Sequence, residues 1–271
     1  MSLNEALFYS VKMQTDLEEF LQQQELNKLA EHLHQTNCFK KVDINDIAIT
    51  KIPYVKYPGI SIEDCVTIHD LAQEVLQISK TENNNNEVAI TYSLDYKELK
   101  EKGEIYKTIV KGNEYETDIT ADTDTFHLLC GRKRNILVSL HNHPTQNIFS
   151  IFDILLFLQE PTIGYMIVIT NRGELHYMYK KPETYDSKTA LSLLAQTIIS
   201  IAPTAHNGIS FQQKELKKEQ MVEISKKFLK QSLKVGVVYH PNSRNEMAIS
   251  QYDIIKKENA LKNIEEEEQE R

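Results

Sequence analysis

Cysteine is scarce in this sequence, and long apolar runs are missing. The three cysteines are far apart, form no CxxC pair and are odd in number, so no disulfide framework is indicated; they are Cys38, Cys65 and Cys130. Such cysteine usage fits a reducing compartment. Apolar stretches such as Ile148 to Leu158 are too short and too interrupted to span a bilayer. Residues 1–20 do not resemble a secretory signal peptide, so we expect a cytoplasmic protein with no membrane partner.

Basic residues are outnumbered by acidic ones. The chain has 39 Asp and Glu against 31 Lys and Arg, a formal net charge of -8. An acidic surface repels phosphate backbones, so nucleic acid is not the expected partner. One lysine cluster has acidic residues interleaved and no aromatic platform, which favours a solvated helix face; it comprises Lys217, Lys218, Lys226, Lys227 and Lys230. The acidic run Glu265 to Glu268 is predicted to be a solvated end.

Residues 1–82 are predicted to be a helical region. Apolar residues recur at three- and four-residue spacing between about Ser2 and His34, which predicts one helix. A second helix opens at Ser61, with Asp64 three residues on as an acidic variant of the capping box, and ends near Lys80. Between them, Val42 to Gly59 holds two prolines and β-branched residues, and is predicted as a connector with room for one strand.

The hydrophobic period changes after residue 82. Four asparagines, Asn83 to Asn86, predict a flexible turn. Beyond them, alternating or short apolar runs predict strands, and Asn171 to Gly173 predicts a hairpin turn. The predicted strands cover residues 88–94, 105–110, 135–140, 164–170 and 174–179, and helices cover 123–130 and 150–158. This mixture predicts an α/β domain over residues 83–182.

Residues 183–271 are predicted to be a mostly helical C-terminal region. Helical patterns cover residues 187–201 and 214–233, and a short apolar run covers 235–239. The predicted organisation is therefore a central α/β domain between two helical regions.

The stretch Leu137 to Leu158 carries the chemistry. His141 and His143 follow an apolar run and are two residues apart, so on an extended segment both imidazoles point the same way. Ser150 can cap the helix that follows, and Asp153 can offer a carboxylate to the same metal ion. Two imidazoles and one carboxylate leave a tetrahedral zinc ion one position short, where a catalytic water binds with its pKa lowered to about 7. A further carboxylate is then needed to transfer the proton.

HNHP followed by S-x-x-D resembles the JAMM motif of the JAB/MPN metallopeptidases, which also has an upstream Glu. The spelling is most similar to bacterial RadC-like and mobile-element-associated members, and the resemblance covers about residues 87–180. It implies a curved mixed sheet flanked by helices, a cytidine-deaminase-like sandwich, with helical extensions at both ends. It also implies a zinc-dependent hydrolase of peptide or isopeptide bonds, acting on a protein or peptide substrate. In that family's pattern His141, His143 and Asp153 bind Zn²⁺, and Ser150 helps to stabilise the tetrahedral intermediate or to position the water.

The general acid and base implied by this resemblance is a Glu on the first strand of the domain. Glu87 opens a predicted strand directly after the asparagine turn, and Glu104, after Gly103, is the second candidate. The loop between Pro144 and Ser150 holds five residues, one fewer than in the most familiar JAMM proteins, so Ser150 and Asp153 could be shifted relative to the histidines.

Other interpretations of the motif lead to different functions. The HNHP spelling also fits a RadC-like accessory protein of DNA repair or mobile elements, without peptidase activity, or an inactive JAB scaffold for protein interaction. An HxH pair also occurs in amidohydrolase barrels, which need around 200 residues or more and further ligands downstream. His141 and His143 would otherwise be ordinary strand-end residues. His127 and Cys130 are spaced like half a metal site, but such a pair is more typical of a helix face packed on a sheet.

Overall fold

A computed structural model describes residues 41–114, 116–130, 132–145, 148–202 and 218–241. The predicted helix at residues 2–34, Cys38, Lys217 and the acidic tail lie outside these residues. Within them the chain is α/β: a six-stranded mixed sheet and seven α-helices. The predicted α/β class is therefore confirmed for the described part of the chain.

The sheet has the strand order β2-β1-β3-β4-β5-β6. Only β3 and β4 pair in parallel, and all the other neighbours are antiparallel. The parallel pair is connected through a helix, as a parallel connection requires. The strands are β1 Val88–Ser93, β2 Lys107–Lys111, β3 Leu137–His143, β4 Ile163–Thr170, β5 Leu175–Lys180 and β6 Val237–His240.

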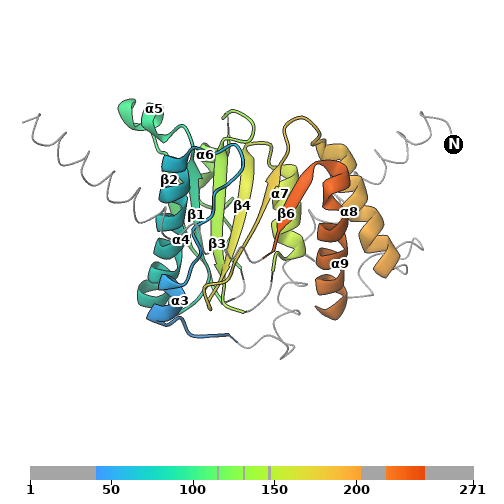
Figure 1. Ribbon diagram of the computed structural model, residues 1–271, viewed down its shortest axis with the longest axis horizontal. Coiled ribbons are helices and arrows are strands. Elements are labelled where there is room, and N and C mark those ends of the chain that lie inside the picture. The colour runs from blue at the N-terminus through green and yellow to red at the C-terminus, as the bar shows by residue number, and fades with distance from the viewer. Residues whose placement is uncertain (1–40, 115, 131, 146–147, 203–217, 242–271) are drawn as a thin grey trace, which may run out of the picture.

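Helices cover both faces of the sheet, because its central strands are apolar on both faces (Figure 1). On one face, α4 packs on β1 and β3, and its core includes Val138 and Leu140. On the other face, α7, α8 and α9 form a second core with Leu137 and Val168. The helices are α3 Asp46–Thr50, α4 Ile62–Glu82, α5 Tyr96–Glu101, α6 Thr123–Leu129, α7 Ile151–Gln159, α8 Ser187–Ile201 and α9 Lys218–Gln231, followed by the 3₁₀ turn η3 Ser232–Val235.

The predicted helices and strands agree with the structure in most of the described residues. Ser61 caps α4 as expected, since its side chain accepts a hydrogen bond from the Asp64 backbone N–H. In the connector at residues 42–59 the structure has the short helix α3 rather than a strand, because Asn45 caps its first turn. Helix α5 was not predicted. The sheet extends beyond residues 83–182, since the sixth strand comes from residues 237–240.

The asparagine run is a turn in which the side chains of Asn83, Asn85 and Asn86 have specific partners. Asn84 and Asn85 have positive φ values of 52° and 60°, which asparagine tolerates better than most residues. The Asn85 side chain accepts a hydrogen bond from the Ile44 N–H, and that of Asn86 accepts one from Lys41. The predicted flexible turn is therefore better described as a built connection between α4 and β1.

The predicted hairpin turn between β4 and β5 is confirmed. Gly173 has φ +82°, and a Cβ there would lie 2.1 Å from the Ala48 carbonyl oxygen, so only glycine lets α3 approach the turn.

Among the helices of the described residues, none combines the length and the apolar character needed to cross a membrane.

Candidate metal centre

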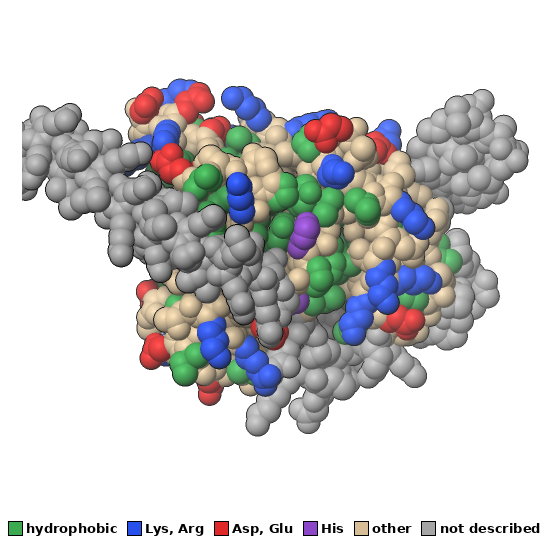
Figure 2. Space-filling view, viewed as in Figure 1, with side chains coloured by type: hydrophobic (Ala, Val, Ile, Leu, Met, Phe, Trp, Pro, Cys, Tyr) green, Lys and Arg blue, Asp and Glu red, His purple; other side chains and the backbone are tan. Residues whose placement is uncertain are grey.

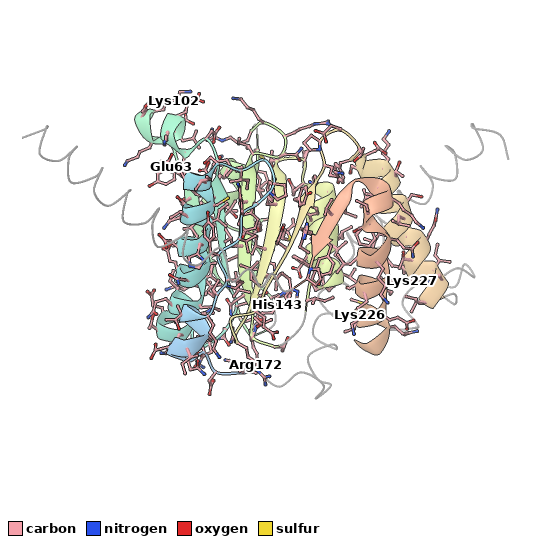
Figure 3. The ribbon with its side chains drawn as sticks, viewed as in Figure 1. Glu63, Lys102, His143, Arg172, Lys226 and Lys227 are labelled. Atoms are coloured by element: carbon pink, nitrogen blue, oxygen red, sulfur yellow. The ribbon has the colours of Figure 1, made fainter. Side chains whose placement is uncertain are left out.

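Strand β3 presents His141 and His143 on one face of the sheet, at the end of the strand. The alternation of a strand places both imidazoles on the face that α7 covers, and it turns Asn142 to the opposite face. Antiparallel pairing sets Ala89 opposite His141, so Glu87, two residues earlier, comes across from His143 on the same face. Figure 3 shows His143 at the end of the sheet where Arg172 and the β4–β5 turn also lie.

Glu87, His141 and His143 form a buried group that could hold a metal ion. The two Nε2 atoms of the histidines are 3.1 Å apart. The Glu87 Oε1 atom lies 3.6 Å from Nε2 of His143 and 4.0 Å from Nε2 of His141. The three residues are only 5–8% exposed, so the group has little contact with solvent.

Helix α7 adds the carboxylate of Asp153 to the same group. Its Oδ1 atom is 3.2 Å from Nε2 of His141, and its Oδ2 atom is 3.3 Å from Nε2 of His143. Asp153 also completes a capping box with Ser150: the Ser150 side chain accepts from the Asp153 N–H, and Asp153 Oδ2 accepts from the Ser150 N–H at 2.6 Å. The predicted cap at Ser150 is thus confirmed, and it fixes the direction of the Asp153 side chain.

Burial and the two histidines separate the pKa values of the two carboxyl groups. Burial raises the pKa of Glu87 from 4.5 to about 7, against the opposing effect of His143 and His141. Burial also acts to raise the pKa of Asp153, but the charges and hydrogen bonds of His141 and His143 outweigh it and hold that pKa well below 3.8. Asp153 is therefore the permanent anion of the group, and Glu87 is the carboxyl group poised to exchange a proton near neutral pH.

A cluster of three rings that the sequence did not indicate, Phe149, Tyr239 and His176, lies near this group. The rings of Phe149 and Tyr239 meet edge to face, with centroids 6.1 Å apart, just before the start of α7. His176 of β5 stacks on Tyr239, and its Nδ1 atom is 3.2 Å from the Tyr239 hydroxyl. Burial lowers the pKa of His176, against the opposing charge of Glu174. Strand β6, far away in the sequence, therefore supports the N-terminal end of the helix that carries Asp153.

The other candidates from the sequence lie elsewhere. Glu104 is about half exposed and forms an ion pair with Arg132 at 3.1 Å. His127 and Cys130 are both exposed at the end of α6, so the expectation that they lie on a helix face packed on the sheet is wrong. They are not part of the group of described residues that could hold a metal ion. Lys226 and Lys230 are exposed on α9, which confirms the expected solvated face for these two; Figure 2 shows lysine and arginine side chains gathered on the same part of the surface.

Comparison of the chain with protein-family models, with curated proteins and with solved structures found no match in any of the three.

Proposed function

We propose that this protein is a zinc-dependent hydrolase of peptide or isopeptide bonds, with His141, His143 and Asp153 as zinc ligands and Glu87 as general base and acid. The observation that carries the proposal is the convergence of these side chains: the two Nε2 atoms are 3.1 Å apart, and each lies beside a different oxygen of the Asp153 carboxylate, at 3.2 Å for His141 and 3.3 Å for His143. Ligand atoms about 2.0–2.1 Å from a tetrahedral zinc ion are about 3.3–3.4 Å apart, which is close to the separation of the two imidazole nitrogens and to that of each nitrogen from its carboxylate oxygen.

The chemistry of the donor set also favours a divalent cation. Buried carboxylates beside imidazoles need a compensating positive charge, and a dication held between them would supply it. Two nitrogens and one carboxylate oxygen are ligands typical of catalytic zinc. Because Asp153 Oδ2 accepts the Ser150 N–H, Oδ1 is the oxygen better placed to coordinate the ion.

Glu87 lies farther from the histidines than Asp153 does, which suits proton transfer better than ligation. Its carboxyl oxygen is 3.6 and 4.0 Å from the two Nε2 atoms. Burial raises the pKa of Glu87 in the metal-free protein, and a carboxyl group at this position is suited to accept a proton from water and to pass it on. Zinc, when bound, would supply Lewis acidity, polarising the scissile carbonyl and lowering the pKa of water to about 7.

Hydrolysis then balances through Glu87. The water oxygen forms a bond to the carbonyl carbon, and Glu87 takes the proton that the water loses. The C–N bond breaks, and Glu87 delivers this proton to the leaving amine nitrogen. The capping box with Ser150 holds the Asp153 carboxylate, the proposed ligand, in place, so that little reorganisation is needed during the reaction.

The proposal is tested with zinc-loaded protein on mixed libraries of peptides and lysine-linked isopeptides, with cleavage read by mass spectrometry. Glu87→Gln should reduce the rate of cleavage by a factor of about 100 or more, while the variant protein still binds zinc. Glu104→Gln is the matched control and should cleave like the wild type, since Glu104 pairs with Arg132 instead. Equal cleavage by Glu87→Gln and the wild type would overturn the role given to Glu87.

A further inference from the structure

Asn142 lies between the two histidines in sequence but faces the other side of the sheet. It is completely buried, under α4 rather than α7. A buried amide has two donor hydrogens and one acceptor oxygen to satisfy, and leaving them without partners is costly. The partners of Asn142 therefore show what this side chain holds in place.

Asn142 bonds to the backbone on both sides of Glu87. Its Oδ1 atom accepts the Val88 N–H at 2.7 Å, and its Nδ2 atom donates toward the Asn86 carbonyl oxygen at 3.2 Å. Asn142 thus replaces, with its side chain, the strand-to-strand hydrogen bonds at the end of β1. Because Val88 and Asn86 are the neighbours of Glu87, the amide fixes the peptide units that flank it.

The side chains of Asn171 and Ser79 accept further hydrogen bonds from the same amide. Its Nδ2 atom lies 2.8 Å from Oδ1 of Asn171 and 3.2 Å from Oγ of Ser79. Asn171 in turn donates to the carbonyl oxygens of Val42 and Asn85, at 2.8 and 3.1 Å. This network connects β3, α4, the β4–β5 turn and the asparagine turn, so the amide cannot shift without disturbing several elements.

The backbone of Glu87 is held by hydrogen bonds on the side of β1 away from β3. Its N–H donates to the Asn113 carbonyl oxygen at 3.0 Å, and its carbonyl oxygen accepts from Gly112 N–H and from the Asn83 side chain. With the backbone held on every side, the direction of the Glu87 side chain is set by the register of β1 on β3. Only a residue that accepts and donates at once can hold both flanks from one position, as asparagine does.

We propose that Asn142 is a positioning residue that holds the Glu87 carboxyl group over the metal ligands His141 and His143. The proposal rests on the proposed zinc site. Asn142 faces the side of the sheet opposite to the ligands, and it acts on the site through Glu87. Its loss should leave the ligands in place while releasing the general base.

The test uses full-length protein loaded with Co²⁺, whose visible absorption bands respond to groups beside the ligands. We expect Asn142→Ala to bind one Co²⁺ with an affinity within about threefold of the wild type and to shift the bands as Glu87→Ala does. Adding Asn142→Ala to Glu87→Ala should cause no further shift, because the amide acts through that carboxyl group. Ser93→Ala is the matched control: this fully buried serine at the other end of β1 bonds Asp95, and its loss should leave the spectrum unchanged.

A milder variant keeps the test decisive if Asn142→Ala does not fold. Ser79→Ala removes one partner of the amide and should give a smaller shift in the same direction. The proposal is overturned if Glu87→Ala shifts the bands and the Asn142 and Ser79 variants do not, or if the shifts of Glu87→Ala and Asn142→Ala add. Absence of Co²⁺ binding by the wild type would instead contradict the proposed function itself.

Discussion

His141 and Asp153 face each other across 3.2 Å, although one lies near the end of β3 and the other in the first turn of α7. The loop between Pro144 and Ser150 is one residue shorter than the JAMM resemblance implies, yet Asp153 still reaches both histidines. The capping box explains this, since it ties the Asp153 side chain to the helix start rather than to the loop. The helix start therefore determines where the carboxylate lies.

Replacing Ser150 should affect both stability and metal binding. Ser150→Ala removes the N-cap of α7 and should lower the free energy of unfolding by about 1 kcal/mol, measured by urea denaturation. It should also weaken zinc binding several-fold, because the Asp153 side chain loses its orientation. Ser61→Ala is the matched control, since it removes the equivalent cap of α4. It should cost similar stability and leave zinc affinity unchanged; equal zinc affinities in the two variants would contradict the role of the capping box.

Glu87 should make the metal-free protein less stable as the pH rises. Its pKa in the folded state is about 7, above its ordinary 4.5, so between these values the folded state holds more protons than the unfolded state. Stability from this group is therefore present below pH 4.5 and is lost as the pH rises to about 7. Asp153 acts in the opposite direction, but below pH 3.8 and so outside this window.

Chemical denaturation of metal-free protein at a series of pH values checks this expectation. Glu87→Gln should be more stable than the wild type at pH 8, and the difference should vanish toward pH 4.5. A difference that does not depend on pH would mean that Glu87 is not protonated more readily in the folded state.

Lys180 should contribute the opposite slope in a separate pH window. Its ammonium group is buried, donates to the Glu160 carbonyl oxygen at 2.6 Å and lies over the rings of Phe157 and Tyr185. Burial lowers its pKa from 10.5 to about 7, so between these values the unfolded state holds more protons and stability rises with pH. The slope is at most about 1.4 kcal/mol per pH unit.

Lys180→Met is the variant that isolates this effect. It keeps the apolar stem against Phe157 and removes the titrating group. From pH 7 to 9 the wild type should gain stability relative to Lys180→Met in urea denaturation. Parallel curves for the two proteins would show that Lys180 keeps an ordinary pKa in the folded protein.

Much of the fold could be predicted because its central elements carry strong local patterns. The apolar runs of β3 and β4 and the capped, periodic α4 are visible in sequence alone. The position of His141 and His143 on one face of the sheet could also be predicted, since side chains alternate along a strand.

Features that depend on distant contacts were not visible. Strand β6 is a short apolar run whose partner, β5, lies far earlier in the chain, so nothing local marks it as part of the sheet. The aromatic contact between Phe149 and Tyr239 has the same origin. The asparagine run looked like a flexible turn, because composition cannot reveal that Asn85 and Asn86 bond to residues 44 and 41.

The proposed zinc site is tested most directly by elemental analysis of purified protein, in the wild type and in the double variant His141→Ala/His143→Ala. A change in circular dichroism would reveal any loss of folding in the variant. We expect about one zinc ion per chain in the wild type and none in a folded double variant. A folded wild type that binds no zinc, even after incubation with excess metal and dialysis, would contradict the account, and protonated histidines paired with Asp153 would then explain the cluster instead.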